Sequence, residues 1–336
     1  MFIQLHGNIP VADIKRSHAR VFRDELRLVP KTRKGALLKA GLQELSQWGR
    51  ERPSAPKVSA VTVNKQLGAV QAIAGLGFRN GLVPDDVPWS DPFKDLRLEE
   101  ERSGRTSFTT SELKSLFDTP LFTAHEWPQG AKCAAGIWLP LLALFSGARQ
   151  AEIAGLQVTN VQHETDTPLL FIVADRKAGK TLKTKVSERV IPVHPQLVKL
   201  GFLEYVEARA REGVHAWLFP AVAPDQHRAL AAWSKWFSRY MRTKACVKDT
   251  NKVFHSFRHR FQDALTHATP DEELRDAIQG RSNQSVSRGY GAKYMLERWR
   301  IEVLGVVIDN VSYPGLDLSR VKPLGTPTSS RGNKRK

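Results

Sequence analysis

Residues 133–156 read CAAGIWLPLLALFSGARQAEIAGL, an apolar run that leads directly into a short polar segment. The apolar run, 133–145, contains Gly136 and Pro140 and is shorter than the roughly 20 residues that a membrane span needs. It therefore predicts a helix buried in a folded domain. The amino terminus, MFIQLHGNIP, has neither the basic start nor the small-residue cleavage site of an export signal. We expect a cytoplasmic protein with no membrane partner.

The chain before this run predicts a separate domain. A length of 336 residues exceeds the roughly 250 to 300 at which a single core stops growing, so two domains are expected. Residues 1–105 read as short helices with apolar residues at helical spacing. The polar stretch from Pro92 to Ser107, PFKDLRLEEERSGRTS, is typical of an exposed linker. We therefore expect a helical domain with its linker in residues 1–105.

Residues 106–310 predict a second domain of mixed structure. Thr109 and Glu112 have the spacing of a capping box at the start of a helix. Apolar runs at 169–174 and 190–193, separated by a Gly- and Lys-rich segment, predict a β-hairpin. Helices are also expected at 229–243, 255–266 and 293–308, with a short helix that ends at Gly280. The fold class that follows is mainly α with a small β-sheet.

The charge of the chain indicates a polyanion as partner. Lys and Arg total 51 against 34 Asp and Glu, which gives a net charge of +17. Residues 311–336 are expected to form a basic, disordered tail, because they are rich in Gly, Pro, Ser and Lys. Residues 1–105 also carry an excess, with 18 basic and 12 acidic side chains. Nucleic acid is therefore the expected partner of both domains.

Three common site motifs have weak counterparts in the chain. Residues 174–181 resemble a phosphate-binding P-loop, but Ala174 stands where the first glycine is required and a second strand follows. His255 and His259 have the spacing of zinc ligands without the glutamate between them. Aromatic residues at 233–240 recur at helical spacing, which is more typical of a core than of a base-stacking platform. We therefore expect no metal and no cofactor.

Four other motifs follow one another in the second domain. In chain order they are SGARQAEIAGL (146–156), KTKVSERVIP (183–192), HSFR (255–258) and GRSNQSVSRGY (280–290). Each motif alone is weak, because short patterns such as H-x-x-R arise often by chance. Their conjunction in this order and spacing is specific.

This set of motifs resembles the tyrosine recombinases, the phage integrase family. The family's first box, T-G-x-R-x-x-E-hydrophobic-x-x-L, is similar to 146–156, and its second box, H-x-x-R, matches His255 and Arg258. The family's third region, L-G-H/W, places the nucleophilic tyrosine nine residues beyond the His or Trp. Here Arg281 occupies the His or Trp position, and Tyr290 follows nine residues later. The resemblance implies a helical core-binding domain followed by a mixed α+β catalytic domain.

The activity implied by the resemblance is site-specific recombination. Such an integrase of a mobile element cuts and rejoins DNA through a 3'-phosphotyrosyl intermediate, which keeps the bond energy for religation. Tyr290 would be the nucleophile, and His255 would accept its proton. Arg149 and Arg258 would bind the non-bridging phosphate oxygens, because a guanidinium offers a planar fork of donors that stays charged.

Three further residues complete the implied site. Lys183 would protonate the departing 5'-oxygen, with Lys185 as the alternative. Glu152 would orient Arg149 from one helical turn away; a surface ion pair is the alternative interpretation of this spacing. Arg281 would donate to the phosphate in place of the usual His or Trp, or else faces solvent beyond the helix end at Gly280.

The partners implied by the resemblance are double-stranded DNA attachment sites and further copies of the chain in a homo-tetramer, with a possible accessory DNA-bending protein. The apolar stripe of the helix expected at 293–308 would dock on a neighbouring protomer. The family's amino-terminal arm-binding domain has no counterpart, either because the protein lacks it or because the chain is a piece of a longer one. The alternative functions are a DNA-binding protein of this fold with weak or absent cleavage, and a relaxing topoisomerase.

Overall fold

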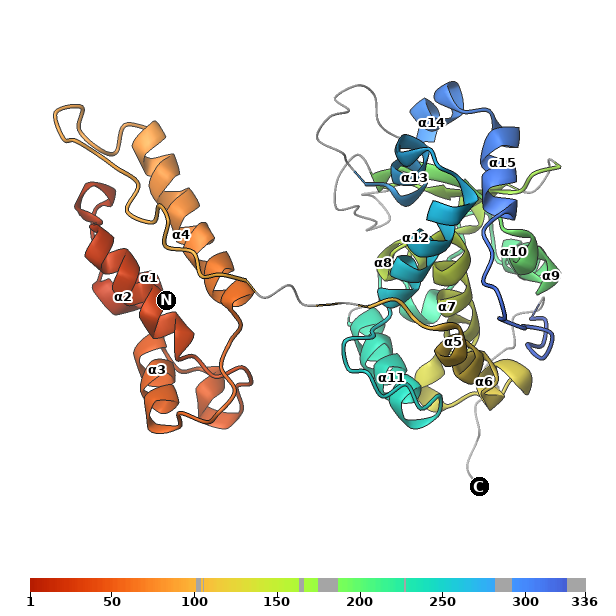
Figure 1. Ribbon diagram of the computed structural model, residues 1–336, viewed down its shortest axis with the longest axis horizontal. Coiled ribbons are helices and arrows are strands. Elements are labelled where there is room, and N and C mark those ends of the chain that lie inside the picture. Colours follow the sequence, from red (N-terminus) through yellow and green to blue (C-terminus); the bar gives the residue numbers. More distant parts are fainter. Residues whose placement is uncertain are drawn as a thin grey trace. The chain divides into compact units, whose positions relative to one another are not determined.

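The computed structural model divides the chain into two compact units, Met1–Ser103 and Gly104–Lys336 (Figure 1). It describes residues 1–100, 104, 106–162, 166–174, 187–226, 228–281 and 292–324. Among the described residues, no helix is both long enough and apolar enough to cross a membrane. The predicted fold class, mainly α with a small β-sheet, is confirmed.

The first unit is helical. Its helices are α1 (Phe2–His6), α2 (Arg16–Arg27), α3 (Leu42–Glu51) and α4 (Ala60–Arg79), with 3-10 turns at Val11–Asp13 and Gly35–Leu38. Phe22 and Leu26 of α2 are buried with Leu67 of α4, so the apolar faces of these helices form one core.

The core of the first unit includes residues beyond Pro92, where the predicted linker begins. Phe93 and Leu96 lie within that polar stretch, yet both are buried in the core of the first unit. The buried Asn64 side chain exchanges two hydrogen bonds of 2.8 Å with the backbone of Leu98. The prediction of an exposed linker from Pro92 is therefore wrong for this part of the chain, because two apolar side chains and one buried amide are enough to hold it.

The second unit contains most of the chain's elements. Before the sheet lie α5 (Thr110–Phe117), α6 (Pro120–Thr123), α7 (Ala134–Ser146) and α8 (Gln150–Ala154). The strands are β1 (Val161–Gln162), β2 (Leu169–Ile172) and β3 (Arg189–Pro192). After them come α9 (Pro195–Lys199), α10 (Phe202–Ala210), α11 (Ala229–Thr243), α12 (Ser256–Ala268), α13 (Glu272–Gln279), α14 (Ala292–Arg298) and α15 (Ile301–Asp309). The remaining 3-10 turns are Gln129–Ala131, Val158–Asn160 and Pro220–Val222.

Helix α7 forms the centre of this unit, as the apolar run predicts. All of its residues are buried, and α12 packs beside it (Figure 1). Gly147 ends α7 in the left-handed conformation, with a φ of 62°. A Cβ at Gly147 would lie 2.3 Å from Cδ1 of Phe261. Only a glycine at this position therefore lets α12 approach the turn so closely. This close approach brings the residues after α7 next to α12.

The sheet confirms the predicted hairpin. Its order is β1-β2-β3, and both pairs are antiparallel, with Leu170 opposite Ile191 and Ile172 opposite Arg189. The segment between the paired strands, 175–186, lies outside the described residues. β1 was not predicted, because two residues carry too little pattern.

Helix α11 confirms that the aromatic stripe belongs to the core. Trp233, Phe237 and Tyr240 are buried, and the indole nitrogen of Trp233 donates a hydrogen bond of 3.0 Å to the Ala131 carbonyl. These rings are therefore unable to stack on bases.

The helix predicted at 293–308 is two helices, α14 and α15, because Arg300 adopts an extended backbone between them. Leu304, Val307 and Ile308 of α15 are buried in the core of the second unit, where α15 packs on β3 and α12. Of the apolar stripe that suggested docking on a neighbouring protomer, Val307 is buried, Leu296 and Trp299 are partly buried against the core, and Val303 is 44% exposed. Part of the stripe is thus used within the chain itself, and docking on a neighbouring protomer stays a prediction.

The predicted disorder of the tail is also wrong for residues 311–324. Val311, Tyr313, Leu318, Val321 and Leu324 are all buried in the core of the second unit. The Tyr313 hydroxyl donates to the Leu144 carbonyl of α7. Single apolar residues spaced among Gly and Pro anchor this irregular segment to the core. Its composition, which is typical of disorder, therefore does not predict its structure. Residues 325–336 lie outside the described part of the chain.

Candidate functional site

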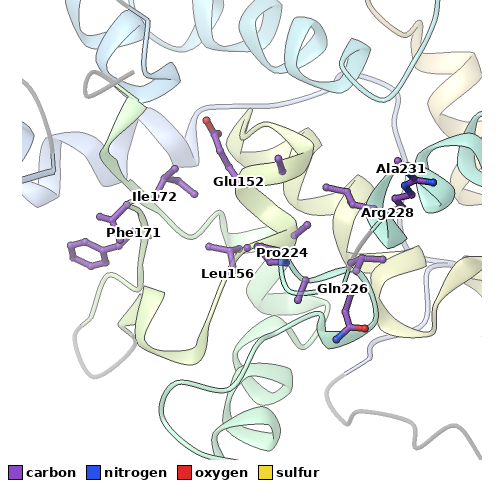
Figure 2. A pocket seen from close by; sticks show the side chains of 15 residues that line it. Glu152, Leu156, Phe171, Ile172, Pro224, Gln226, Arg228 and Ala231 are labelled. Carbon is purple, nitrogen blue, oxygen red and sulfur yellow. The ribbon is translucent and has the colours of Figure 1, made fainter. Parts of the chain in front are cut away.

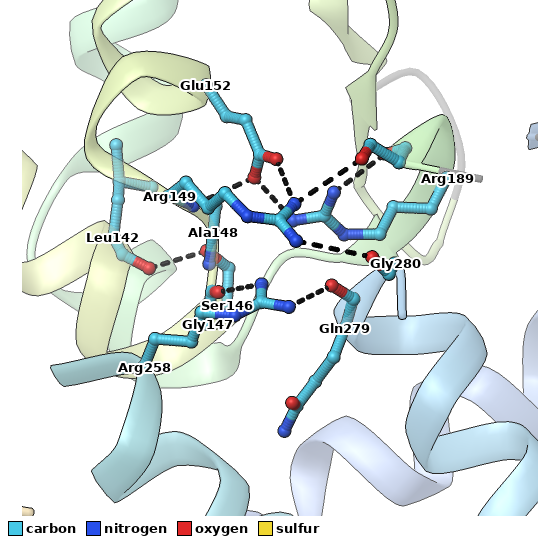
Figure 3. A network of polar contacts seen from close by, with 11 residues as sticks. Leu142, Ser146, Gly147, Ala148, Arg149, Glu152, Arg189, Arg258, Gln279 and Gly280 are labelled. Carbon is cyan, nitrogen blue, oxygen red and sulfur yellow. Dashed lines mark hydrogen bonds and ion pairs between the residues drawn. The ribbon is translucent and has the colours of Figure 1, made fainter. Parts of the chain in front are cut away.

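Four arginines from separate segments of the second unit gather around the turn between α7 and α8. They are Arg149 in that turn, Arg189 at the start of β3, Arg258 in α12 and Arg281 just after α13. Figure 3 shows Arg149 and Arg189 on the carboxylate of Glu152, with Arg258 below them between two backbone carbonyls. The first and second boxes, and the residue that replaces the family's His or Trp, therefore meet in space.

Glu152 is the carboxylate that organises this cluster. Oε1 accepts a hydrogen bond of 2.6 Å from Nη1 of Arg149, and Oε2 accepts one of 2.7 Å from Nη2 of Arg189. Oε2 also accepts from the backbone N–H of Arg149 at 2.8 Å, which fixes the first turn of α8. The side chain of Glu152 is only 5% exposed, so the alternative of a surface ion pair does not describe it.

The protonation of Glu152 follows from these contacts. Burial alone would raise its pKa, but the charge of Arg189 and the hydrogen bonds from Arg189 and Arg149 lower the pKa from 4.5 to about 2. The carboxylate is therefore ionised in the folded chain at neutral pH and is protonated more readily in the unfolded chain.

This lowered pKa predicts a pH-dependent contribution to stability. The contribution is complete above pH 4.5 and is lost as the pH falls from 4.5 towards 2, because protons then bind the unfolded chain first. We expect Glu152→Gln to lower the free energy of unfolding by about 3 kcal/mol at pH 7 and by much less near pH 2. Urea unfolding of both proteins at several pH values measures the difference, and a difference that stays constant with pH would contradict this account.

Arg258 is buried, and its hydrogen-bond acceptors are neutral backbone carbonyls. Its side chain donates through Nη1 to the Gly147 carbonyl at 2.6 Å and through Nη2 to the Gln279 carbonyl. The residue is 3% exposed. Burial and the charges of Arg189 and Arg149 lower the pKa of Arg258 to about 9, so it stays protonated at neutral pH. The carbonyls orient this guanidinium without neutralising it.

Arg281 points toward α12 and not into open solvent. Its Nη2 donates to Oε1 of Gln262, one turn beyond Arg258, and its backbone N–H donates to the Asp276 carbonyl at 2.9 Å. Burial lowers the pKa of Arg281, although Asp276 opposes that shift. Arg258 and Arg281 thus donate to neutral oxygen atoms, and Glu152 is shared between the other two arginines. The cluster has more positive than negative charge, which suits a bound phosphate.

His255 lies at the amino-terminal end of α12, one turn before Arg258. Its ring is 5.1 Å from that of His259, in an edge-on arrangement. Within the described ranges, no group of three or more His, Cys, Asp or Glu side chains is placed to hold a metal ion. Lys183, Lys185 and Tyr290 lie outside the described residues, as does most of the P-loop-like run.

Arg189 is the residue of this site that sequence reasoning missed. It lies in the quoted segment KTKVSERVIP, but no role was assigned to it. Its side chain is fully buried, and it is ion-paired with Glu152. The available signal was an arginine at the start of a strand of β-branched residues, where a buried charge requires a carboxylate partner.

A separate cleft of about 270 Å³ lies between α8, β2 and the start of α11 (Figure 2). Its lining is mostly apolar, with Leu156, Phe171 and Ile172 among the residues. Glu152 contributes to the lining, but in Figure 2 its carboxylate points away from Leu156 and Pro224. Its donor side chains are Gln226 and Arg228, so among the described residues this cleft has one arginine where the cluster has four, and the arginine cluster is the better candidate site for an anion.

Comparison with solved structures gives the fold. The Tn1549 transposon integrase in complex with transposon right end DNA matches over 87% of each chain, with 17% identity and a TM-score of 0.50. The same integrase with circular intermediate DNA matches over 88% of each chain, with 15% identity and a TM-score of 0.50. The chain has the fold of a tyrosine recombinase integrase.

A further solved structure is less similar, and the comparisons with sequences found no match. The integrase from mycobacterium phage Brujita matches over 91% of this chain and 90% of its own, with 17% identity and a TM-score of 0.42. No protein-family model and no curated protein sequence matches the chain. The identities to the solved integrases are low, so what this integrase-like chain does has to be argued from its site.

Proposed function

We propose that the chain is a site-specific tyrosine recombinase, an integrase of a mobile element that cuts and rejoins DNA through a 3'-phosphotyrosyl intermediate. The observation that carries the proposal is the arginine cluster. In an integrase fold, Arg149, Arg258 and Arg281 lie around one turn with excess positive charge. In sequence, Tyr290 follows this cluster in the register of the family's nucleophile.

The cluster suits the charge that develops on a phosphate during strand cleavage. Attack by a tyrosine oxygen puts negative charge on the non-bridging phosphate oxygens, and fixed guanidinium donors stabilise that charge. Arg149 is the more accessible donor, with its side chain 27% exposed. Arg258 is buried and held by two carbonyls, so its position costs no reorganisation when the phosphate arrives.

The remaining steps are assigned to residues by chemistry and register. Tyr290 forms a bond to phosphorus as the 5'-oxygen leaves, and the phenol needs an acceptor because its ordinary pKa is near 10. His255 accepts this proton, and Lys183, or alternatively Lys185, protonates the leaving 5'-oxygen. The reverse attack by a 5'-hydroxyl releases Tyr290, so no nucleotide is consumed.

The proposed partners are duplex attachment sites, contacted by both units, and further copies of the chain in a tetramer. The net charge of +17 supports DNA binding that weakens steeply with salt. The proposal places the protein in the cytoplasm, on the nucleoid. An accessory DNA-bending protein remains part of the expectation taken from the resemblance.

Covalent capture tests the proposal without knowledge of the target site. The protein is incubated with fragmented genomic DNA from its source, denatured in detergent, and the DNA that stays attached is sequenced. We expect a small set of sequences, each attached through its 3'-phosphate at a cut. The same assay on a nicked duplex of the captured sequence then gives a cleavage rate.

A DNA-binding protein without cleavage is the second candidate, favoured by Arg281 in the position of the family's His or Trp. Enrichment of specific fragments under native conditions, with none attached after denaturation, would support this candidate instead.

The contribution of Arg281 is a separate prediction. We expect Arg281→Ala to slow cleavage about tenfold to a hundredfold, because one charge-assisted hydrogen bond to the phosphate is lost. Arg281→His should restore most of the rate, since an imidazole also donates. Arg275→Ala is the matched control. It also removes an arginine from this part of the chain, but Arg275 lies in α13 and donates to the Thr269 carbonyl. Cleavage by Arg281→Ala at the unmodified rate would exclude the donor role.

A further inference from the structure

Arg189 connects the segments that form the candidate site. It is fully buried at the first position of β3. Its Nη2 donates to Oε2 of Glu152 at 2.7 Å, and its Nη1 donates to the Ser187 carbonyl at 2.8 Å. The guanidinium thus connects the first turn of α8 with the residues immediately before β3 (Figure 3).

The same guanidinium also packs against the turn after α13. Gly280 has a φ of 60°, and a Cβ at this position would lie 3.0 Å from Nη1 of Arg189. The carbonyl of Gly280 lies 3.5 Å from Nη2 of Arg149, as an acceptor. The backbone of this turn therefore lies directly on Arg189, and Arg281 is the next residue.

Arg189 itself is not placed to bind DNA. With none of its surface exposed, it is unable to reach a phosphate in this conformation. Its fork instead matches two acceptors on different segments, which a lysine does not do. Its effect on a reaction at the cluster has to pass through its neighbours.

We propose that Arg189 is a positioning residue, which holds Glu152 and thereby sets the orientation of Arg149, and which fixes the Gly280 turn from which Arg281 extends. This inference rests on the proposed function for its catalytic consequence. Its structural part, the control of Glu152 and the Arg149 turn, does not depend on that function.

A buried arginine elsewhere in the unit provides a matched control. Arg209 in α10 is 6% exposed and donates to the Trp217 carbonyl at 3.0 and 2.9 Å, with Glu212 as its ion-pair partner. Substitution of either arginine by methionine removes a buried guanidinium and its ion pair, although Glu212 is 57% exposed and Glu152 is buried. A loss that is merely structural is therefore expected from both, while a positioning effect is expected from Arg189→Met alone.

A double-mutant cycle tests the catalytic consequence. Cleavage rates are measured at saturating DNA for Arg189→Met, Arg149→Ala and the two combined. We expect Arg189→Met to lower the rate about tenfold to a hundredfold, with DNA affinity within about twofold. The combined loss should be clearly smaller than the product of the single losses, because Arg189 acts through Arg149. Multiplicative losses, or an equal loss in Arg209→Met, would overturn the proposal.

Hydrogen exchange tests the structural part even if the chain does not cut DNA. The Arg149 amide is protected by its bond to Glu152, so Arg189→Met should speed exchange in the peptide that contains Arg149, and Arg209→Met should not. Unchanged exchange in Arg189→Met would overturn the proposal. Absence of cleavage by the unmodified protein would instead count against the proposed function.

Arg189→Lys keeps the test informative if Arg189→Met does not fold. It preserves the charge beside Glu152 but is unable to bridge Glu152 and the Ser187 carbonyl as a planar fork. We expect Arg189→Lys to fold, to cleave about tenfold more slowly and to exchange faster at Arg149. A rate and an exchange pattern equal to those of the unmodified protein would contradict the positioning role.

Discussion

Tyr290→Phe is expected to abolish covalent attachment to DNA while leaving DNA binding unchanged. The substitution removes the single oxygen that forms the bond to phosphorus, and loss of a nucleophile typically lowers a rate by about 10⁴-fold or more. The measurement is the yield of protein attached to a nicked duplex of the captured sequence, with native gel mobility as the binding assay. The ring is retained, so any packing by this residue is preserved.

Tyr294→Phe is the matched control for this substitution. It removes the same oxygen four residues later, outside the register with Arg281, and should leave attachment at the unmodified level. Attachment that persists in Tyr290→Phe and disappears in Tyr294→Phe would transfer the nucleophile to Tyr294.

Arg149→Ala is expected to lower the cleavage rate about 10²- to 10³-fold, as removal of one fixed donor to a developing oxyanion does. Glu152 keeps its bond to Arg189 in this variant, so the fold should survive. Arg149→Lys should recover little of the rate, because a lysine does not offer two donors in one plane. Single-turnover cleavage at saturating DNA measures the effect separately from binding.

Arg242→Ala is the control for Arg149→Ala. Arg242 is also partly buried and donates to the Val247 and Lys252 carbonyls, but it makes no contact with the cluster. Its loss should leave cleavage within about threefold of the unmodified rate. An equal loss in both variants would indicate damage to the fold and not the removal of a phosphate donor.

Much of the second unit's core could be predicted from the sequence, because it depends on local pattern. The apolar run at 133–145 predicted α7, the helical spacing of Trp233 and Phe237 predicted the buried face of α11, and two apolar runs predicted the hairpin. The two boxes converge as their order suggested. The reason is visible in the structure, since Gly147 both ends α7 and lets Phe261 of α12 approach.

The errors share a physical cause. In each case a few buried residues determine the structure of a segment whose overall composition indicates something else. Phe93 and Leu96 attach a polar stretch to the first core, and Tyr313 and Leu324 anchor a Pro- and Gly-rich segment to the second. Arg189 was overlooked because an arginine in sequence is ordinarily exposed, and its carboxylate partner lies in another element. Such contacts between distant segments have no local signature.

The most direct test of the central claim is the mass of the protein after covalent capture. The unmodified chain is trapped on a nicked duplex of its captured sequence, the DNA is trimmed by nuclease, and the peptides are analysed by mass spectrometry. We predict a nucleotide linked through its 3'-phosphate to the peptide that contains Tyr290, at that residue. A protein that binds the same duplex specifically, yet carries no nucleotide on any peptide, would contradict the claim that this chain cuts and rejoins DNA.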